Sequence, residues 1–179
     1  SGWEGEICNR EIPKPPPPPP DPCANAISLT PDITNIEPGN TYILDKNTEI
    51  TRSFINEGTL CIPKNFYLSI KGTFKNKDKI YNNNAIYNYN KITNSSGATI
   101  NNSQIIYNDG SIINSSGATI NNNKNIFNYH GSEIINSSGA TINNIWMQSE
   151  KGATITNNGL FNNDQLKNRG TITNTNKLS

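Results

Sequence analysis

One segment of the sequence occurs three times between residues 91 and 144, with few changes. It reads KITNSSGATINN at 91–102, SIINSSGATINN at 111–122 and EIINSSGATINN at 133–144. The glycines shared by the three copies, Gly97, Gly117 and Gly139, lie 20 and then 22 residues apart. A repeat of this length is typical of a solenoid, in which every repeat forms one coil and stacks on the coil before it.

The residue pattern within a repeat favours β-strands over helices. Apolar residues do not recur with helical spacing, and Asn, Gly and Thr are poor helix formers. Large apolar residues recur instead every 6 to 8 positions, at Ile100, Ile106, Ile113, Ile120, Phe127, Ile135 and Ile142. Three short strands per coil, joined by bends rich in Gly and Asn, fit this spacing. The sequence therefore predicts an all-β fold, a three-sided parallel β-helix (β-solenoid) with about 20–22 residues per turn.

Equivalent residues of successive coils are expected to stack along the solenoid axis, about 4.8 Å apart. The predicted inward stacks are Ile100–Ile120–Ile142 on one wall, Ile106–Phe127 on the second and Ile113–Ile135 on the third. Outward asparagines are expected to form amide ladders in the same way. The two extra residues of the second period are placed near Tyr129–His130 and at Glu133, where a corner can bulge.

The rest of the chain divides into segments of different composition. Residues 1–12 are interpreted as an N-terminal arm, and residues 13–22, with six consecutive prolines, as a stiff polyproline II linker of which the prolines span about 19 Å. Residues 23–70 alternate short apolar runs with Gly, Pro and Asn bends, which predicts the first coils and an end cap. Residues 71–179 form the Asn-rich solenoid, whose pattern loosens after Ile145 and ends near Asn174.

Composition limits the classes of partner. The chain of 179 residues is only 32% hydrophobic and carries a net charge of +1, which suits a narrow solenoid core better than a sphere. Because the charge is so low and no basic patch stands out, no nucleic-acid partner is expected. No run approaches 18 apolar residues, so no membrane span is expected either. No cofactor is predicted.

Residues 1–8, SGWEGEIC, carry a GWxGxxC motif that resembles the closing strand of an EGF-like module. In that family the last cysteine pairs with one in an upstream CxC, which this chain lacks. The resemblance therefore implies that Cys8 pairs with a cysteine that precedes Ser1, or with another subunit. The alternative interpretation is a short N-terminal arm anchored by its aromatic residue.

Three cysteines leave one without a partner inside the chain. A Cys23–Cys61 disulfide would tie the arm to the end cap. The competing pair, Cys8–Cys23, would have to close over the proline rod, whose stiffness makes that geometry awkward. With one histidine and no CxxC or HxxxH spacing, no metal site is predicted.

Two kinds of modification are predicted. The glycosylation sequon N-x-[ST] occurs at Asn94, Asn101, Asn114 and Asn136. Three of these, Asn94, Asn114 and Asn136, hold the same place in successive repeats, so glycans there would form a row along one edge; alternatively, NSSG is a favourable turn that duplication has repeated. The proline run resembles hydroxyproline-rich wall glycoproteins, which implies hydroxylation and O-glycosylation at Pro15, Pro16, Pro17, Pro18, Pro19 and Pro20.

Catalysis is not expected. The predicted fold resembles that of pectate lyases and several polysaccharide hydrolases, which need clustered carboxylates, often with a nearby arginine. Asp109 and Glu133 fall at different phases of the coil, and the three arginines, Arg10, Arg52 and Arg169, are far apart in sequence. His130 lies alone in a bend, where an exposed turn residue is expected. We therefore predict no catalytic residues and a chain that is not an enzyme.

The sequence favours a structural role outside the cell. In its broad features it resembles β-helical surface proteins, including adhesins, viral fibres and glycosylated extracellular fibrils. We expect a subunit of a glycosylated filament or appendage on a cell or virion surface, assembled head-to-tail from its own copies. The alternative is a carbohydrate-binding adhesin or viral receptor-binding fibre, which would bind glycans through outward aromatic residues. The candidates are Tyr107, Phe127, Tyr129 and Trp146.

Overall fold

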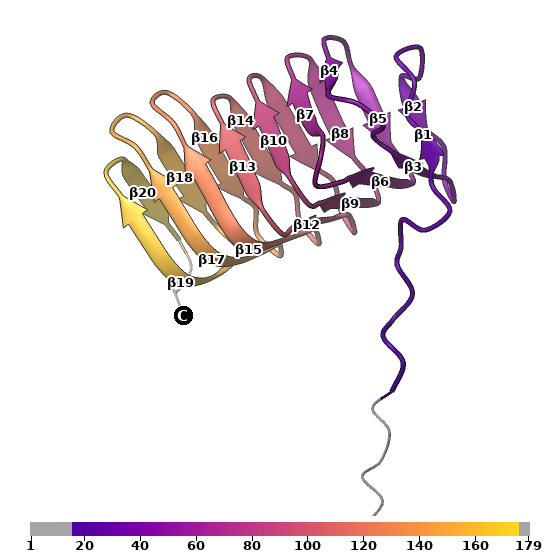
Figure 1. Cartoon of the computed structure of the whole chain (residues 1–179). Helices are drawn as coiled ribbons and strands as arrows, with labels where there is room; N and C mark the ends of the chain where they lie inside the picture. The colour runs from indigo at the N-terminus through magenta and orange to yellow at the C-terminus, as the bar shows by residue number, and fades with distance from the viewer. Residues whose placement is uncertain (1–15, 176–179) are drawn as a thin grey trace, which may run out of the picture.

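The computed structural model of the chain describes residues 16–175. They form a parallel β-solenoid of about seven turns, with no helix among the described residues. Figure 1 shows the coils advancing side by side from β1 to β20. The fold class predicted from the repeat is confirmed.

Three strands per coil build three walls, and every strand pair is parallel. The first wall contains β1 (Ile27–Ser28), β3 (Thr41–Ile43), β6 (Thr59–Ile62), β9 (Lys79–Asn82) and β12 (Thr99–Asn102). The second wall contains β4 (Thr48–Ile50), β7 (Tyr67–Ile70), β10 (Ala85–Asn88) and β13 (Ile105–Asn108). The third wall contains β2 (Asn35–Ile36), β5 (Phe54–Asn56), β8 (Thr73–Asn76), β11 (Lys91–Asn94), β14 (Ser111–Asn114), β16 (Glu133–Asn136), β18 (Thr154–Asn157) and β20 (Thr171–Asn174).

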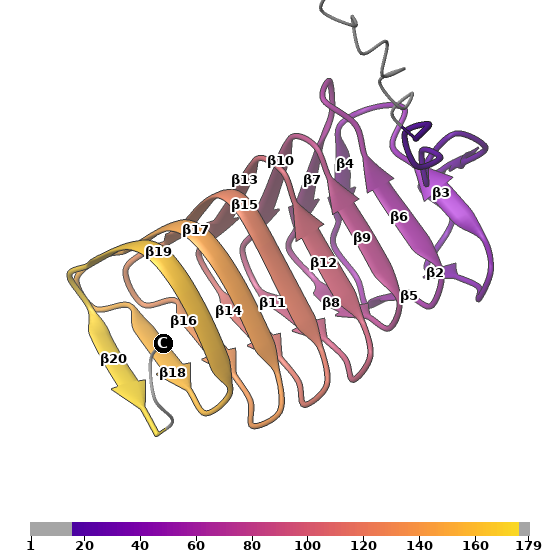
Figure 2. The ribbon, with the colours of Figure 1, turned by 90° about the horizontal axis from the view of Figure 1, so that it is seen from below.

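The first two walls merge in the later coils. There a single bent strand runs across both walls in each coil: β15 (Thr119–Asn128), β17 (Thr141–Ser149) and β19 (Leu160–Asn168). The result is one sheet of 12 strands and a second of eight. In Figure 2 the first wall can be followed strand by strand in chain order, from β3 to β19.

The predicted inward stacks are partly right. Ile100, Ile120 and Ile142 are in register and buried, as predicted. On the second wall Ile106 stacks on Ile126, whereas Phe127 stacks on Tyr107 outside the core, so the predicted Ile106–Phe127 stack is wrong.

On the third wall Ile113 and Ile135 are in register but half-buried on the outer face, so their predicted inward direction is wrong. Their neighbours Ile112 and Ile134 are the core residues, each 2% exposed. Strand side chains alternate between the two faces, so an error of one residue in phase reverses the direction of every side chain.

From β11 onward the corners are either two or four residues long. In these later four-residue corners the third residue is a glycine with a positive φ, which lies between 76° and 79° at Gly97, Gly117 and Gly139. The corner before β16 holds residues 129–132 where the preceding coil has only residues 109–110. The predicted bulge at Tyr129–His130 is therefore confirmed. Glu133 is not part of it, because it is in strand register with Ser111.

The N-terminal end of the solenoid is closed by a covalent bond. A disulfide joins Cys23 to Cys61 of β6, with the two Cα atoms 6.2 Å apart. Of the two pairings considered for Cys23, the one with Cys61 is therefore the one that forms. Residues 16–20 are exposed and carry no strand. The predicted arm at residues 1–12, with its EGF-like motif and Cys8, lies outside the described residues, as does Pro15.

Ile112→Asn and Ile113→Asn separate the two faces of one strand. Ile112→Asn should lower the free energy of unfolding by about 3–5 kcal/mol, because it leaves a cavity and buries an amide without a partner. Ile113→Asn, on the outer face, should cost less than about 1 kcal/mol. Chemical denaturation of both variants measures the difference, and equal losses would contradict this assignment of the faces.

Candidate functional site

Asparagines at the ends of strands, or in the middle of the long strands β15, β17 and β19, form three ladders along the solenoid axis, which are called the corner ladders. The first contains Asn56, Asn76, Asn94, Asn114, Asn136, Asn157 and Asn174; the second contains Asn82, Asn102, Asn122, Asn144 and Asn163; the third contains Asn88, Asn108 and Asn128 and continues to Ser149. Within each ladder the Nδ2 of one asparagine donates to the Oδ1 of the next, at 2.5–2.9 Å. Each corner ladder therefore links one coil to the next inside the core.

The second hydrogen of each amide explains why asparagine occupies these positions. Asn114 Nδ2 donates to Oδ1 of Asn136 and also to the backbone carbonyl of Thr141 in the next coil, both at 2.9 Å. Thr141 is the first residue of β17, and a backbone carbonyl has two lone pairs, so it can accept a bond from the amide as well as a bond from the backbone. One asparagine amide can therefore accept from the preceding coil and donate both to the next asparagine and to a carbonyl of the next coil.

Amide ladders exist on both faces of the strands, although only the outer one is predicted from the sequence. An outer ladder of Asn101, Asn121, Asn143 and Asn162 matches the prediction, with Nδ2–Oδ1 distances of 2.8–3.0 Å. The corner ladders, by contrast, are not predicted from the sequence; Asn122, for example, is only 1% exposed. The sequence signal that could have revealed them is the asparagine that ends nearly every strand of the repeats.

Each corner ladder begins against an isoleucine. Ile36, Ile62 and Ile70 are in register with the first asparagines, Asn56, Asn82 and Asn88. Because an isoleucine cannot donate a hydrogen bond, Oδ1 of Asn56 and Oδ1 of Asn88 are buried without a partner. Oδ1 of Asn82 accepts instead from the backbone N–H of Asn84, at 3.2 Å.

The corner ladders decide which sequons are accessible. Asn94, Asn114 and Asn136 are fully buried, and the Nδ2 atom that would carry a glycan is hydrogen-bonded in each. The predicted row of projecting glycans at these three residues is therefore incompatible with the fold. Asn101 lies half-buried on the outer face, so N-glycosylation at Asn101 stays a prediction. Modification of the exposed prolines stays a prediction as well.

The four aromatic candidates for glycan binding all lie on the outside of the solenoid. Tyr107 and Phe127 belong to a stack along the axis that starts at Tyr87, with ring centroids 4.9 and 5.4 Å apart and planes within 14° of parallel. Tyr67 and Trp146 meet the two ends of this stack edge-on, and Tyr129 lies parallel to Tyr107 at 6.2 Å.

This stacking limits what the aromatic surface can bind. Rings stacked along the axis cover one another's faces and present their edges to solvent. A sugar ring packs on an aromatic face, so the middle of the stack offers no such platform. Burial, followed by the neighbouring tyrosines, raises the pKa of Tyr87. Burial, then Tyr107 and Asp109, raises the pKa of Tyr129.

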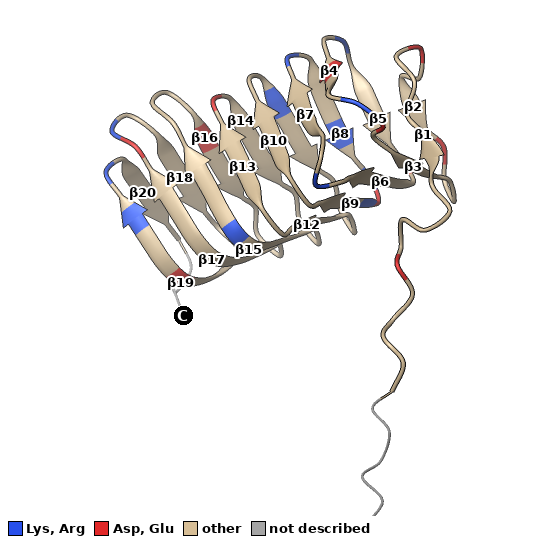
Figure 3. Cartoon of the chain, in the orientation of Figure 1, with Lys and Arg blue, Asp and Glu red and all other residues tan. Residues whose placement is uncertain are grey.

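The charged residues stay dispersed in the structure, as Figure 3 shows. Glu133 accepts a hydrogen bond from Ser111 Oγ at 2.8 Å, and Arg169 forms an ion pair with Glu150 at 3.5 Å. His130 is exposed at its corner, and Arg10 lies outside the described residues. Among residues 16–175, no three His, Cys, Asp or Glu residues come together as a metal site would require.

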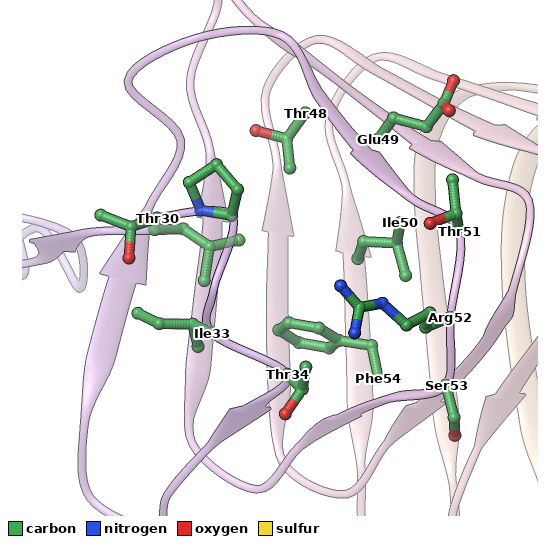
Figure 4. Close-up of a pocket in the computed structure, with 12 residues that line it drawn as sticks. Thr30, Ile33, Thr34, Thr48, Glu49, Ile50, Thr51, Arg52, Ser53 and Phe54 are labelled. Atoms are coloured by element: carbon green, nitrogen blue, oxygen red, sulfur yellow. The ribbon is translucent and has the colours of Figure 1, made fainter.

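A small cleft of about 70 Å³ opens at the N-terminal end, where the coils are least regular. It lies between the segments 29–34 and 48–54. Figure 4 shows the Arg52 guanidinium beside Ile50 and Phe54 in this cleft. Its lining continues the apolar core, so we interpret it as the end of the core packing.

Asn114→Ala tests the corner ladders. The variant leaves Nδ2 of Asn94, Oδ1 of Asn136 and the carbonyl of Thr141 without one of their partners, so it should cost about 3 kcal/mol or more in the free energy of unfolding. The matched control Asn121→Ala removes a rung of the outer ladder, where water can replace the lost bonds, and should cost less than about 1 kcal/mol. Denaturant titration of both variants checks the prediction; a smaller loss for Asn114→Ala than for Asn121→Ala would contradict it.

The aromatic surface predicts a loss of stability in alkali. The pKa values of Tyr87 and Tyr129 are raised above the ordinary 10.0, so the folded chain holds these protons more tightly than the unfolded chain does. Their contribution is complete below about pH 10 and is lost as the pH rises through the raised values. A Tyr87→Phe/Tyr129→Phe double variant keeps the rings and should lose less stability than the parent between pH 10 and 12. Denaturation curves of both proteins at several pH values, each compared with pH 8, measure this difference. An equal decline in the free energy of unfolding for the parent and the double variant would contradict the prediction.

Within the described residues no helix is long and apolar enough to cross a bilayer. No protein-family model, curated protein or solved structure shows a significant match to this chain. The fold and these surfaces are therefore the basis on which a function can be proposed.

Proposed function

We propose that this chain is the structural subunit of an extracellular, glycosylated filament or surface appendage, with the solenoid as its rigid shaft. The corner ladders are the observation that carries this proposal. They add buried side-chain hydrogen bonds to the backbone bonds at nearly every junction between coils. Because a solenoid's stability is the sum of its repeats and their junctions, bonds at the junctions stiffen the whole length.

The disulfide supports an extracellular location, and the low charge of the solenoid supports a role in a filament. A structural disulfide such as Cys23–Cys61 persists mainly in oxidising compartments, including the outside of the cell. The central coils carry only four charged residues from Ile80 to Met147, namely Lys91, Asp109, Lys124 and Glu133. Neighbouring shafts would therefore repel one another little, even when they are packed closely.

The two ends of the described chain differ in a way that suits head-to-tail contact. Within residues 16–175, β19 pairs only with β17, and β20 only with β18, so each keeps one free edge. Such edges favour pairing with another chain. At the other end the exposed proline segment leads away from the first coil, as Figure 1 shows. A rod of this kind extends about 3.1 Å per residue and could contact a neighbouring subunit.

The outward aromatic residues favour the alternative function, a glycan-binding adhesin or receptor-binding fibre. The requirement that these side chains point outward is met. The ring stacking weighs against it, because Tyr87, Tyr107 and Phe127 turn their faces to one another. We therefore rank the shaft above the adhesin.

Deletion of residues 1–22 tests the assembly. Electron microscopy should show filaments for the full chain and folded monomers for the truncated chain, whose circular dichroism should remain that of a β-solenoid. A control that replaces Pro15–Pro20 with six Gly/Ser residues keeps the length and removes the stiffness, and we expect it to assemble poorly. Normal filaments from the truncated chain, or a full chain that stays monomeric at high concentration, would exclude arm-mediated assembly.

A further inference from the structure

One corner of the solenoid carries an alternation of charged and aromatic residues. Six residues hold equivalent positions at this corner, because each directly follows a strand of the second wall and donates its backbone N–H to a carbonyl of the preceding coil. They are Lys71, Tyr89, Asp109, Tyr129, Glu150 and Arg169. The hollow between Tyr89 and Tyr129, with Asp109 between them and Tyr87 and Tyr107 beside them, is called the tyrosine slot below. Its volume is about 280 Å³.

The walls of the tyrosine slot are two aromatic faces. Tyr89 lies within 8° of parallel to Tyr87, Tyr87 within 11° of Tyr107, and Tyr107 within 5° of Tyr129, so Tyr89 and Tyr129 are close to parallel. The two rings belong to positions two coils apart, which sets an upper separation of about 10 Å. Because the coil between them carries Asp109 at this position, no ring at this corner lies directly between the two faces, although Tyr107 lies offset beside Tyr129 at 6.2 Å.

The groups that converge on the tyrosine slot all present negative charge. The carboxylate of Asp109 makes no hydrogen bond or ion pair within residues 16–175. The other charged residues of the same corner are paired, Lys71 with Glu49 at 2.7 Å and Arg169 with Glu150 at 3.5 Å. The face of an aromatic ring is the negative part of its quadrupole. The slot therefore places an unpaired anion between two electron-rich faces.

We propose that the tyrosine slot binds a quaternary ammonium group. A cation midway between the rings lies about 5 Å from each, inside the range of about 6 Å over which a ring face attracts a cation. Its methyl groups need no hydrogen-bond acceptors, which suits aromatic walls. A primary ammonium is strongly hydrated and would give up part of that hydration between the rings. A neutral sugar could pack on the rings, but it would leave the charge of Asp109 uncompensated.

Titration of the full chain with tetramethylammonium chloride tests the proposal, with tyrosine ring resonances in the NMR spectrum as the readout and equal sodium chloride as the reference. We expect saturable binding on the order of millimolar. Asp109→Asn and Tyr129→Leu should each weaken binding by about threefold or more. Tyr129→Phe keeps the ring face and should bind as the parent does. Asp164→Asn, which removes the same charge from β19, is the matched control and should have no effect.

The outcomes separate this proposal from a sugar site and from the shaft function. Saturation by methyl β-glucoside without saturation by tetramethylammonium would overturn it in favour of a glycan site. Unchanged binding in Asp109→Asn would also overturn it, because the anion would then play no part. The proposed filament contacts do not involve the tyrosine slot, so assembly by the Asp109→Asn variant would show that any lost binding is local.

Discussion

Each buried asparagine amide donates a hydrogen bond to the next coil, and the regularity of the solenoid depends on this interaction. A narrow coil with one or two apolar residues per wall has little core, so other bonds between coils must add to what the apolar stacks supply. The amides add such bonds at the corners, since the same Nδ2 atom bonds a side chain and a backbone carbonyl of the next coil, as at Asn114. Asparagine is uncommon inside proteins because a buried amide must be satisfied on every side. Here the neighbouring coils satisfy it.

The fold itself could be predicted from the sequence, because the repeat specifies both the period and the chemistry of the corners. Gly97, Gly117 and Gly139 marked the four-residue corners, where a positive φ requires glycine. The prediction that failed concerns which residues of a strand face the core. In SIIN two adjacent isoleucines satisfy the same pattern, and only the structure shows that Ile112 is inside and Ile113 outside. Had the asparagine that ends each strand been recognised as buried, the alternation would have placed Ile112 inside as well.

The surfaces were harder to predict because they depend on residues brought together by stacking. The sequon at Asn94 looks like an exposed turn in the sequence, yet its asparagine is the last inward residue of β11. The alternative function requires the aromatic candidates on the outside, and they lie there, although Phe127 was also predicted in an inward stack. Their stacking follows from coil register rather than from any local motif. The tyrosine slot has the same origin: Tyr89, Asp109 and Tyr129 lie about 20 residues apart in sequence and meet only because the corners superimpose.

The corner ladders also bear on how a shaft of this kind can change its length. One unit of about 20 residues contributes one rung to each ladder and one layer to each apolar stack, and it presents the same donors and acceptors on its two sides. A tandem duplication of that unit therefore needs no compensating substitution at the new junction. The near-identical segments at 91–102, 111–122 and 133–144 are what such duplications would leave behind. Recombination between them would lengthen or shorten the shaft in steps of about 5 Å per coil.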